Sequence, residues 1–409
     1  MALAPRRAPA PIEPVRVVAY TATSAVGRGR AALRDALQTG RGGLTANDFG
    51  PQRLDTYVGR VAGVEQAPLP SGLSDWECRN NRLAWLGCQG DDFIAAVARA
   101  RARHGAERIA LVVGTSTSSI GATEEAYRSL DPDGGFPAAS RNPLVHTPHS
   151  LGMFLQQAFD LAGPCVTVST ACSSSAKVFA QAERMLRLAL VDAAVVAGVD
   201  TLCGSVLFGF HALQLVSAQP CRPFDAERDG ISLGEAAGFA LLERAGGAAD
   251  ADGLLLLGYG ESSDAHHMSS PRPDGLGAER AIDDALARAG LDAAAIDYIN
   301  LHGTASTKND EVEAALVARR FGDATAASST KGFVGHTLGA AGIVEAVISL
   351  LAIEHGLVPG TLNCRTPDPA CGPQLVLRAR QRPVRRALSN SFGFGGSNCA
   401  LIFGDRRAA

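Results

Sequence analysis

The sequence predicts an α/β protein whose β-sheets are covered by helices on both faces. First, the 409 residues are 46% hydrophobic and only 5% aromatic and include 45 glycines, a composition that favours α/β layers over an all-β structure. Second, the short apolar runs rich in Val and Ile are continuous rather than alternating, as in strands that are buried on both faces. Third, helical patterns such as residues 278–291 separate these runs.

The apolar runs also indicate how the chain is organised. The predicted strands are residues 15–20, 108–114, 165–169, 193–199, 254–260, 296–302, 373–379, 386–392 and 398–404. A similar alternation of strands and helices precedes and follows the Ala/Gly/Asp-rich link at residues 243–253, which we expect to be a surface loop. We therefore predict a flexible tail at residues 1–14 and two related halves, residues 15–250 and 251–409. No residue-level self-similarity demonstrates a duplication.

Composition and charge exclude several classes of protein. The net charge of -3 and the lack of a basic stripe interleaved with aromatics argue against a nucleic-acid partner. The nine cysteines form no CxxC pair, so neither a zinc site nor a disulfide framework is expected. The first residues lack the apolar core of a secretory signal. The apolar stretch 338–356 is interrupted by Glu345 and predicts a buried helix rather than a membrane span. We expect a soluble, cytoplasmic protein.

One cysteine follows a predicted strand directly. Cys172 lies within VSTACSSSA (168–176), and apolar residues then recur at the i, i+3, i+4, i+7 spacing of a helix with one buried face. Ser and Thr residues before that helix are typical of helix caps. We predict that Cys172 lies at or near a helix N-terminus, where free amides would lower the thiol pKa and bind an oxyanion. A buried, inert cysteine is the alternative at this point.

Two histidines follow strand-like runs and begin glycine turns. His302 stands in NLHGTAST and His336 in KGFVGHTLG, with Lys331 five residues before His336. Side chains at such element ends can converge, and a nearby lysine would hold down the pKa of a neutral histidine. Taken singly, each histidine is more typical of a surface or satisfied core position.

Two further features are ambiguous from the residues alone. Glu313 and Glu345 fall in the helices that follow the histidine turns, and we expect them in solvent or in helix salt bridges. The turn SNSFGFGGSN (389–398) holds three glycines and two phenylalanines, so a backbone N–H could point into a site. An ordinary tight connection is the alternative. Cys399 beyond the turn is expected to be a strand residue without a role.

Six motifs then occur in a recognisable order. They are STACSSS (169–175), CRPFDAERDGISLGEAAG (221–238), SSDAHHMSSP (262–271), HGTAST (302–307), KGFVGHTLGAAG (331–342) and FGFGGSN (392–398). Together they closely resemble the elongating β-ketoacyl-acyl-carrier-protein synthases, which are condensing enzymes of thiolase fold, over nearly the whole chain. The resemblance implies duplicated βαβαβαββ halves in a five-layer α-β-α-β-α sandwich.

The resemblance also assigns roles to individual residues. Cys172 matches the nucleophile that accepts the acyl chain, His302 and His336 match the pair that binds the malonyl thioester carbonyl, and Lys331 matches the lysine that tunes them. Phe394 matches the gating residue whose backbone N–H joins that of Cys172 in the oxyanion hole, with Phe392 beside it. The remaining matches are the pantetheine-binding Thr304 and Ser306 and the supporting acidic residues Glu313, Glu345 and Asp264. The two glutamates would then be buried, against the expectation from the residues alone.

The implied reaction is a decarboxylative Claisen condensation of a Cys-bound acyl chain with malonyl-acyl-carrier protein. It needs no metal and no bound cofactor, because the phosphopantetheine arrives on the acyl carrier protein. The family implies an obligate dimer, either a homodimer or a heterodimer with a related synthase. Arg101 and Arg103 are candidates for docking the carrier protein.

Departures from the family pattern concern the substrate. Thr21, Thr23 and Ser24 replace a usual glycine pair, and residues 112–127 are richer in hydroxyl groups than usual. In relatives this segment reaches across the dimer interface near Thr117 to form the floor of the acyl pocket. The stretch resembles that of synthases from aryl-polyene and related polyketide clusters, which predicts conjugated or aryl acyl chains rather than saturated ones.

The rival interpretations differ at these same residues. A non-catalytic chain-length-factor-like partner subunit would lack Cys172 or one of the histidines. A thiolase would use a second cysteine as base, and a synthase that initiates on coenzyme A primers would have Asn in place of one histidine. A binding module with merely structural glycines would leave Cys172 unlabelled by a cysteine-directed inhibitor.

Overall fold

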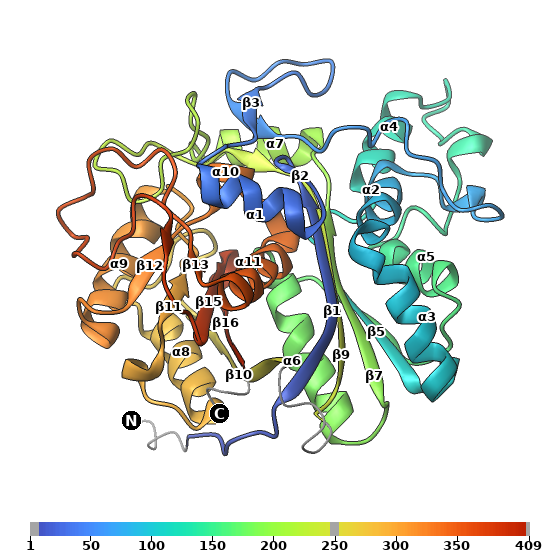
Figure 1. The fold of residues 1–409 in the computed structure, drawn as a ribbon. Coiled ribbons are helices and arrows are strands. Elements are labelled where there is room, and N and C mark those ends of the chain that lie inside the picture. The colour runs from blue at the N-terminus through green and yellow to red at the C-terminus, as the bar shows by residue number, and fades with distance from the viewer. Residues whose placement is uncertain (1–7, 246–252, 406–409) are drawn as a thin grey trace, which may run out of the picture.

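Five strands from each half form one long path of hydrogen-bonded strands in the computed structural model, which describes residues 8–245 and 253–405 (Figure 1). The first half contributes β1 (Val15–Ser24), β5 (Ile109–Gly114), β6 (Cys165–Val168), β7 (Ala193–Asp200) and β9 (Ala236–Arg244). The second half contributes β10 (Leu254–Ser263), β11 (Tyr298–Asn300), β12 (Ala326–Ser328), β15 (Arg386–Gly393) and β16 (Ser397–Asp405).

Helices and shorter strands complete the fold. The helices are α1 (Gly29–Thr39), α2 (Arg79–Cys88), α3 (Phe93–His104), α4 (Ile120–Arg128), α5 (Ser150–Ala158), α6 (Ser174–Arg187), α7 (Gly204–Ala212), α8 (Leu276–Ala289), α9 (Thr307–Phe321), α10 (Lys331–Val334) and α11 (Ala341–His355). The short strands are β2 (Gly27–Arg28), β3 (Leu44–Ala46), β4 (Tyr57–Gly59), β8 (Leu233–Gly234), β13 (Leu357–Val358) and β14 (Arg380–Gln381).

The strand order demonstrates the duplication that the sequence only suggested. The first half is ordered β6-β5-β7-β9-β1 and the second β12-β11-β15-β16-β10, so each places its third, second, fourth, fifth and first strands side by side. Parallel and antiparallel pairings also match between the halves. The halves join where β1 runs antiparallel to β10, with Val15 opposite Leu256.

The layers follow from which residues are apolar. Each half contributes a five-stranded sheet, and the two sheets are continuous through β1 and β10. Strand β5 buries alternate residues on opposite faces: Ala110 and Val112 pack in the core between the two sheets, and Leu111 and Val113 pack in the core beneath α3 and α5. Helices α6 and α11 contact each other between the sheets, and α8 and α9 cover the far face of the second half (Figure 1). The result is the predicted five-layer α-β-α-β-α sandwich.

The apolar stretch around Glu345 is a core helix, as predicted. Residues 338–355 are apolar enough to cross a membrane by composition, with a mean hydropathy of 1.6, but 89% of this stretch is buried inside the protein. Both sheets pack against α11, which explains why it is apolar on all sides.

Some predicted elements differ in the structure. Residues 373–379 form no strand, because Leu375 makes only an isolated bridge to Ala327 on the short edge strand β12. Strands β9 and β12 were missed: β9 runs through a glycine-rich motif into the link, and β12 is made of Ala and Ser, which have low strand propensity. Within the predicted tail, the Ile12 N–H donates to the Arg288 carbonyl. Residues 1–7 and the boundary at 250/251 lie outside the described residues.

Candidate active site

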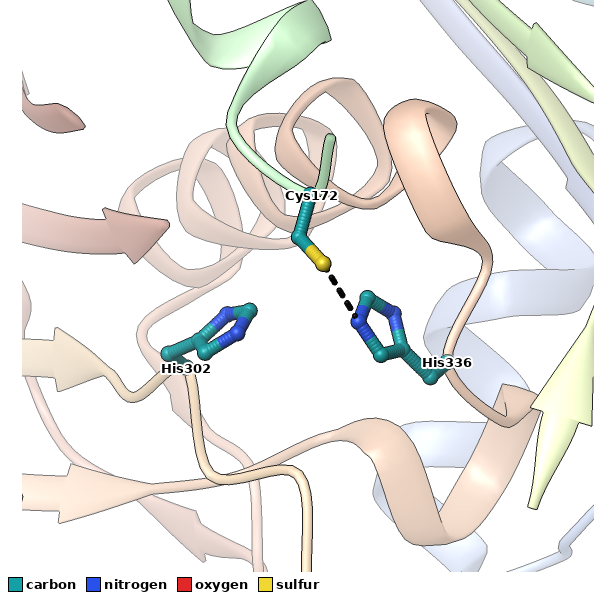
Figure 2. Close-up of side chains that lie close together, drawn as sticks. All are labelled: Cys172, His302 and His336. Carbon is teal, nitrogen blue, oxygen red and sulfur yellow. Dashed lines mark hydrogen bonds between the residues drawn. The ribbon is translucent and has the colours of Figure 1, made fainter. Parts of the chain in front are cut away.

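Three side chains from both halves converge between the sheets. Cys172 lies in the turn between β6 and α6, His302 follows β11, and His336 lies between α10 and α11. All three are buried, with exposed fractions of 2–4%. Figure 2 shows the Cys172 sulfur directed at the ring of His336, with the His302 ring facing the same space. These are the three residues predicted from the sequence to react, and the fold brings them together.

The turn that carries Cys172 has an unusual backbone. Ala171 adopts a φ of 52°, a region that few residues with a side chain occupy, and α6 begins at Ser174. The expected side-chain cap is absent at the N-cap residue Ser173, whose hydroxyl donates instead to the Thr170 carbonyl at 2.9 Å. The turn therefore presents the thiol without the capping that the sequence predicts.

The thiol pKa is the reverse of the one expected. Burial raises the pKa of Cys172 to about 11, while hydrogen bonds from the backbone of Phe394 and of Cys172 itself, and the Lys331 charge, act in the opposite direction. Loss of water around the sulfur therefore outweighs these hydrogen bonds and the Lys331 charge. The same two backbone N–H groups are the oxyanion donors that the family resemblance implies.

Both histidines are held in the neutral form. Burial lowers the pKa of His302 and of His336 well below the usual value, and the positive charge of Lys331 adds to this effect. The two rings stand nearly perpendicular, at 87°, with centroids 5.5 Å apart. His336 Nε2 lies 3.0 Å from Cys172 Sγ. A neutral imidazole donates through one nitrogen and accepts through the other.

Lys331 orients His302. Its ammonium pairs with the buried Glu345 carboxylate, donates to the His302 carbonyl at 2.5 Å, and lies 3.4 Å from His302 Nδ1. Because an ammonium only donates, Nδ1 is the accepting nitrogen and Nε2 carries the proton, so an N–H is available to a substrate oxygen. Burial raises the pKa of Glu345 to about 7 although Lys331 opposes this shift.

Glu313 supports the His302 loop from beneath. One carboxylate oxygen accepts from the His302 N–H and the other from the Gly303 N–H, both at 2.8 Å. Asn390 donates to the same carboxylate at 3.1 Å. Glu313 and Glu345 are 1% and 3% exposed, so the surface position expected from the residues alone is wrong, and the position implied by the family resemblance is confirmed.

The space above the three side chains is a cavity of about 160 Å³. Its lining includes Cys172, His302, His336, Thr304, Ser306, Asp264, Phe392, Phe394, Phe210 and Lys308. The hydroxyls of Thr304 and Ser306 lie 2.9 Å apart. Phe210, whose ring lies 5.5 Å from that of Phe394, could not be predicted from the sequence, because an aromatic residue inside an apolar helix carries no distinguishing pattern.

Asp264 and Phe392 act at the edge of this arrangement. Asp264 accepts from Asn398 Nδ2 at 2.7 Å and from the Arg272 N–H at 3.0 Å, which fixes the loop that closes one side of the cavity. The Phe392 ring lies 6.0 Å from the His302 ring. Asp264 thus supports the cavity wall and does not contact the Cys-His-His group.

Comparisons with known proteins identify the family of this chain. The sequence model of the β-ketoacyl synthase N-terminal domain matches residues 94–248, and that of the C-terminal domain matches residues 255–365. Nodulation protein E of Rhizobium meliloti (strain 1021) is 37% identical over 304 residues, which are 72% of this chain and 75% of that protein. The chain belongs to the β-ketoacyl synthase family.

Other members extend the comparison. The 3-oxoacyl-[acyl-carrier-protein] synthase 2 of the same organism is 44% identical over 59% of this chain, and the match spans 61% of that protein's length. A chain from the complex of ketosynthase ApeO with its chain length factor ApeC, from Xenorhabdus doucetiae, superposes with a TM-score of 0.83 at 35% identity and covers 96% of this chain and 98% of that one. The predicted family and thiolase-type fold are confirmed, and the relatives' names agree with the predicted enzyme class.

Thr117, the residue predicted to act across a dimer interface, has its partners within this chain. Thr117 donates through its hydroxyl and its backbone N–H to the Asp200 carboxylate, at 2.6 and 2.7 Å, and it is absent from the lining of the Cys172 cavity. Thr115 also donates to Asp200, at 2.7 Å. Within this chain the hydroxyls of Thr115 and Thr117 bind a buried carboxylate, and the proposed role of Thr117 in an acyl pocket stays a prediction.

The reactive atoms of this family member also have the spacing of a metal site. One ligand atom each of Cys172, His302 and His336 lies within 4.8 Å of the others. Such a set would suit zinc. The expectation that the synthase works without a metal therefore needs its own test.

Proposed function

We propose that this synthase catalyses the decarboxylative condensation of an acyl chain on Cys172 with malonyl-acyl-carrier protein, to give β-ketoacyl-acyl-carrier protein. The observation that carries the proposal is the buried thiol facing two neutral imidazoles at the end of a cavity lined by Thr304 and Ser306. A chain-length-factor-like partner is not favoured, because the nucleophile and both histidines are present.

Acyl transfer comes first. The Cys172 sulfur attacks the incoming thioester carbonyl while neutral His336, with its proton on Nε2, donates to that sulfur. The bond between the carbonyl carbon and the pantetheine sulfur breaks, and the thiol proton of Cys172 ends on the pantetheine sulfur, which leaves as a thiol. The N–H groups of Cys172 and Phe394 stabilise the oxyanion that forms, a contribution worth about 10²–10³-fold in rate for each such donor. One thioester replaces another, so this step divides the reaction into two easier ones.

Carbon–carbon bond formation follows. Thr304 and Ser306 hold the pantetheine arm of malonyl carrier protein so that the malonyl carbonyl oxygen faces the N–H groups of His302 and His336. Loss of CO2 leaves an enolate whose negative oxygen accepts from both. The enolate carbon attacks the acyl-Cys172 carbonyl, and collapse of the tetrahedral oxyanion releases the Cys172 thiolate, which takes up a proton from water to restore the thiol.

The partners and location belong to the same proposal. The relative from Xenorhabdus doucetiae is a complex with a chain length factor, which supports a related synthase as partner. A dimer with a second copy, action on acyl carrier protein and a cytoplasmic location are further parts of the proposal. Arg101 and Arg103 pair with Asp160 and Glu243, and neither lines the cavity. Lys308 does line the cavity, so it replaces them as our candidate for docking the carrier.

A panel of acyl carriers with malonyl carrier, with product masses read directly, tests this function. We expect products two carbons longer, bearing a β-keto group, and no loss of rate after dialysis against a chelator. Faster extension of conjugated or aryl chains would assign the enzyme to an aryl-polyene type of pathway, and preference for saturated chains would contradict that assignment. Cerulenin should modify only a peptide containing Cys172. Labelling elsewhere, or no condensation with any pair, would overturn the proposal.

A further inference from the structure

Two helices, one from each half, begin directly behind the reactive thiol. Helix α6 starts at Ser174, just after Cys172, and α11 starts at Ala341, a short turn after His336. Two fully buried residues of the first half, Ser175 and Asp200, reach across to α11. Neither has a role in the chemistry proposed above.

These two residues cap α11 from outside its own half. The N–H groups in the first turn of a helix have no partner within the helix, and the N-cap residue Ala340 supplies no side-chain bond. Ser175 Oγ accepts from the Ile343 N–H and Asp200 Oδ2 from the Ala340 N–H, each at 2.9 Å. Ser175 thus does what an N-cap serine ordinarily does, and Asp200 places a carboxylate at the positive end of the helix dipole.

Asp200 is itself rigidly held. Its Oδ1 atom accepts from the hydroxyls of Thr115 and Thr117 and from the backbone N–H groups of Ser116 and Thr117, at 2.6–2.9 Å. Its position at the end of β7 is therefore fixed by the segment that follows β5. Two hydroxyls of this hydroxyl-rich segment, those of Thr115 and Thr117, are therefore committed to the Asp200 carboxylate.

Glycines bring the two helix starts to backbone contact. A Cβ on Gly342 would lie 2.4 Å from the Ala176 nitrogen, and a Cβ on Gly198 would lie 2.5 Å from the Ser175 Cβ. The turn from His336 to α11 also contains Leu338 at a φ of 56°, an uncommon conformation for a bulky residue. Such a turn keeps its shape only where its surroundings hold it, so a change in these contacts would be transmitted to His336.

We propose that Ser175 and Asp200 are positioning residues that set the geometry between Cys172 and His336: Ser175 locks the start of α11 to the start of α6, and Asp200 locks it to the end of β7. For its kinetic consequences this inference rests on the proposed condensation. A misplacement of about 1 Å can lower a rate about 100-fold, and here it would displace the N–H that must face both the thiol and the malonyl oxygen.

The test compares Ser175→Ala and Asp200→Asn with the matched control Ser349→Ala. Ser349 is also buried, but its hydroxyl donates to the Glu345 carbonyl within α11. For each purified full-length variant we would measure kcat and KM for malonyl carrier, the rate of Cys172 alkylation by iodoacetamide against pH, and the melting temperature. Kinetics would be read well below the melting temperature of the least stable variant.

We expect Ser175→Ala and Asp200→Asn to lower kcat about tenfold or more while KM changes less than about threefold, as for an interaction expressed in the transition state. The alkylation profile of Cys172 should move to higher pH, because the thiolate loses the nearby His336 donor. Ser349→Ala should keep kcat within about twofold.

Two results would overturn the inference: unchanged kcat and alkylation profiles in both cross-half variants, or an equal loss in Ser349→Ala. If Asp200→Asn does not fold, Ser175→Ala decides alone. The alkylation profile needs no turnover, so a shift in the variants of an enzyme that condenses nothing would support the positioning role and reject the proposed reaction.

Discussion

His336 Nε2 lies 3.0 Å from Cys172 Sγ, yet the pKa of that thiol is raised to about 11 by burial. The nucleophile is therefore stored as a thiol beside a neutral imidazole rather than as a free thiolate. Its reactivity depends on donors that surround the sulfur, the backbone N–H groups of Phe394 and Cys172, and on proton transfer during the attack. This arrangement limits oxidation and non-specific alkylation, which require the thiolate.

Alkylation of free enzyme should report this thiol directly. Because the raised pKa keeps Cys172 protonated, the rate of its modification by iodoacetamide should still be rising above about pH 8.5, where an ordinary cysteine is already half ionised. Peptide mass spectrometry over a pH series measures it, with Cys172→Ser as the control that removes the signal. A rate that reaches its plateau by neutral pH would contradict the buried-thiol description.

The histidines should make activity unusually tolerant of mild acid. Their lowered pKa values keep both imidazoles neutral even below the ordinary histidine pKa of about 6.5. The rate of malonyl-carrier decarboxylation should therefore stay constant as the pH falls to about 6.5. Unfolded histidines bind protons there and folded ones do not, so the histidines' contribution to the free energy of unfolding falls as pH drops below about 6.5.

Lys331→Met provides the control for this pH profile. Removing the ammonium should raise the pKa of both imidazoles and move the acid limb of the kcat profile to higher pH. An acid limb near pH 6.5 in the native enzyme that does not respond to Lys331→Met would show that burial and Lys331 do not set the histidine charge.

The buried ion pair between Lys331 and Glu345 predicts a non-additive pair of substitutions. Glu345→Gln leaves an ammonium without a counter-ion in a site where both side chains are at most 4% exposed, and should lower the free energy of unfolding by roughly 3–5 kcal/mol. Adding Lys331→Met should recover much of that loss. Urea unfolding of the two single variants and the double variant measures this coupling, and additive losses would argue against it. Activity should not recover, because His302 loses its orienting donor.

Thr304 and Ser306 should affect binding more than chemistry. If their hydroxyls hold the pantetheine arm, the double substitution to Ala removes about two hydrogen bonds of roughly 1 kcal/mol each and should raise KM for malonyl carrier by about tenfold or more. Single-turnover decarboxylation at saturating carrier should change little. Ser306→Thr, which keeps a hydroxyl, is the matched control. A fall in the single-turnover rate with KM unchanged would assign these residues to the reaction itself.

Much of the site could be predicted because the residues that carry its chemistry lie in short sequence motifs. Cys172, His302, His336 and Lys331 each lie at an element end beside small residues, and their order and spacing led to the family. The residues alone left Glu313 and Glu345 on the surface, since a glutamate in a helix has the same local pattern whether it meets water or a buried backbone. Strand β12 could not be predicted for a related reason: three small residues form a strand there only because β11 lies beside them.

The sequence by itself determined the layer architecture, the reacting residues and the kind of chemistry, because hydrophobic periodicity and residue identity are local properties. Only the tertiary structure decided the charge states of the reacting residues, the contacts that hold them in position and the environment of the hydroxyl-rich segment. Burial of Cys172 reverses the pKa expected at a helix start, and Thr117 is bound to Asp200. Ser175 reaches Ile343, 168 positions away along the chain. Such effects depend on how much water is excluded from the site and on which residues, distant in sequence, lie beside it. No short stretch of sequence specifies either of these.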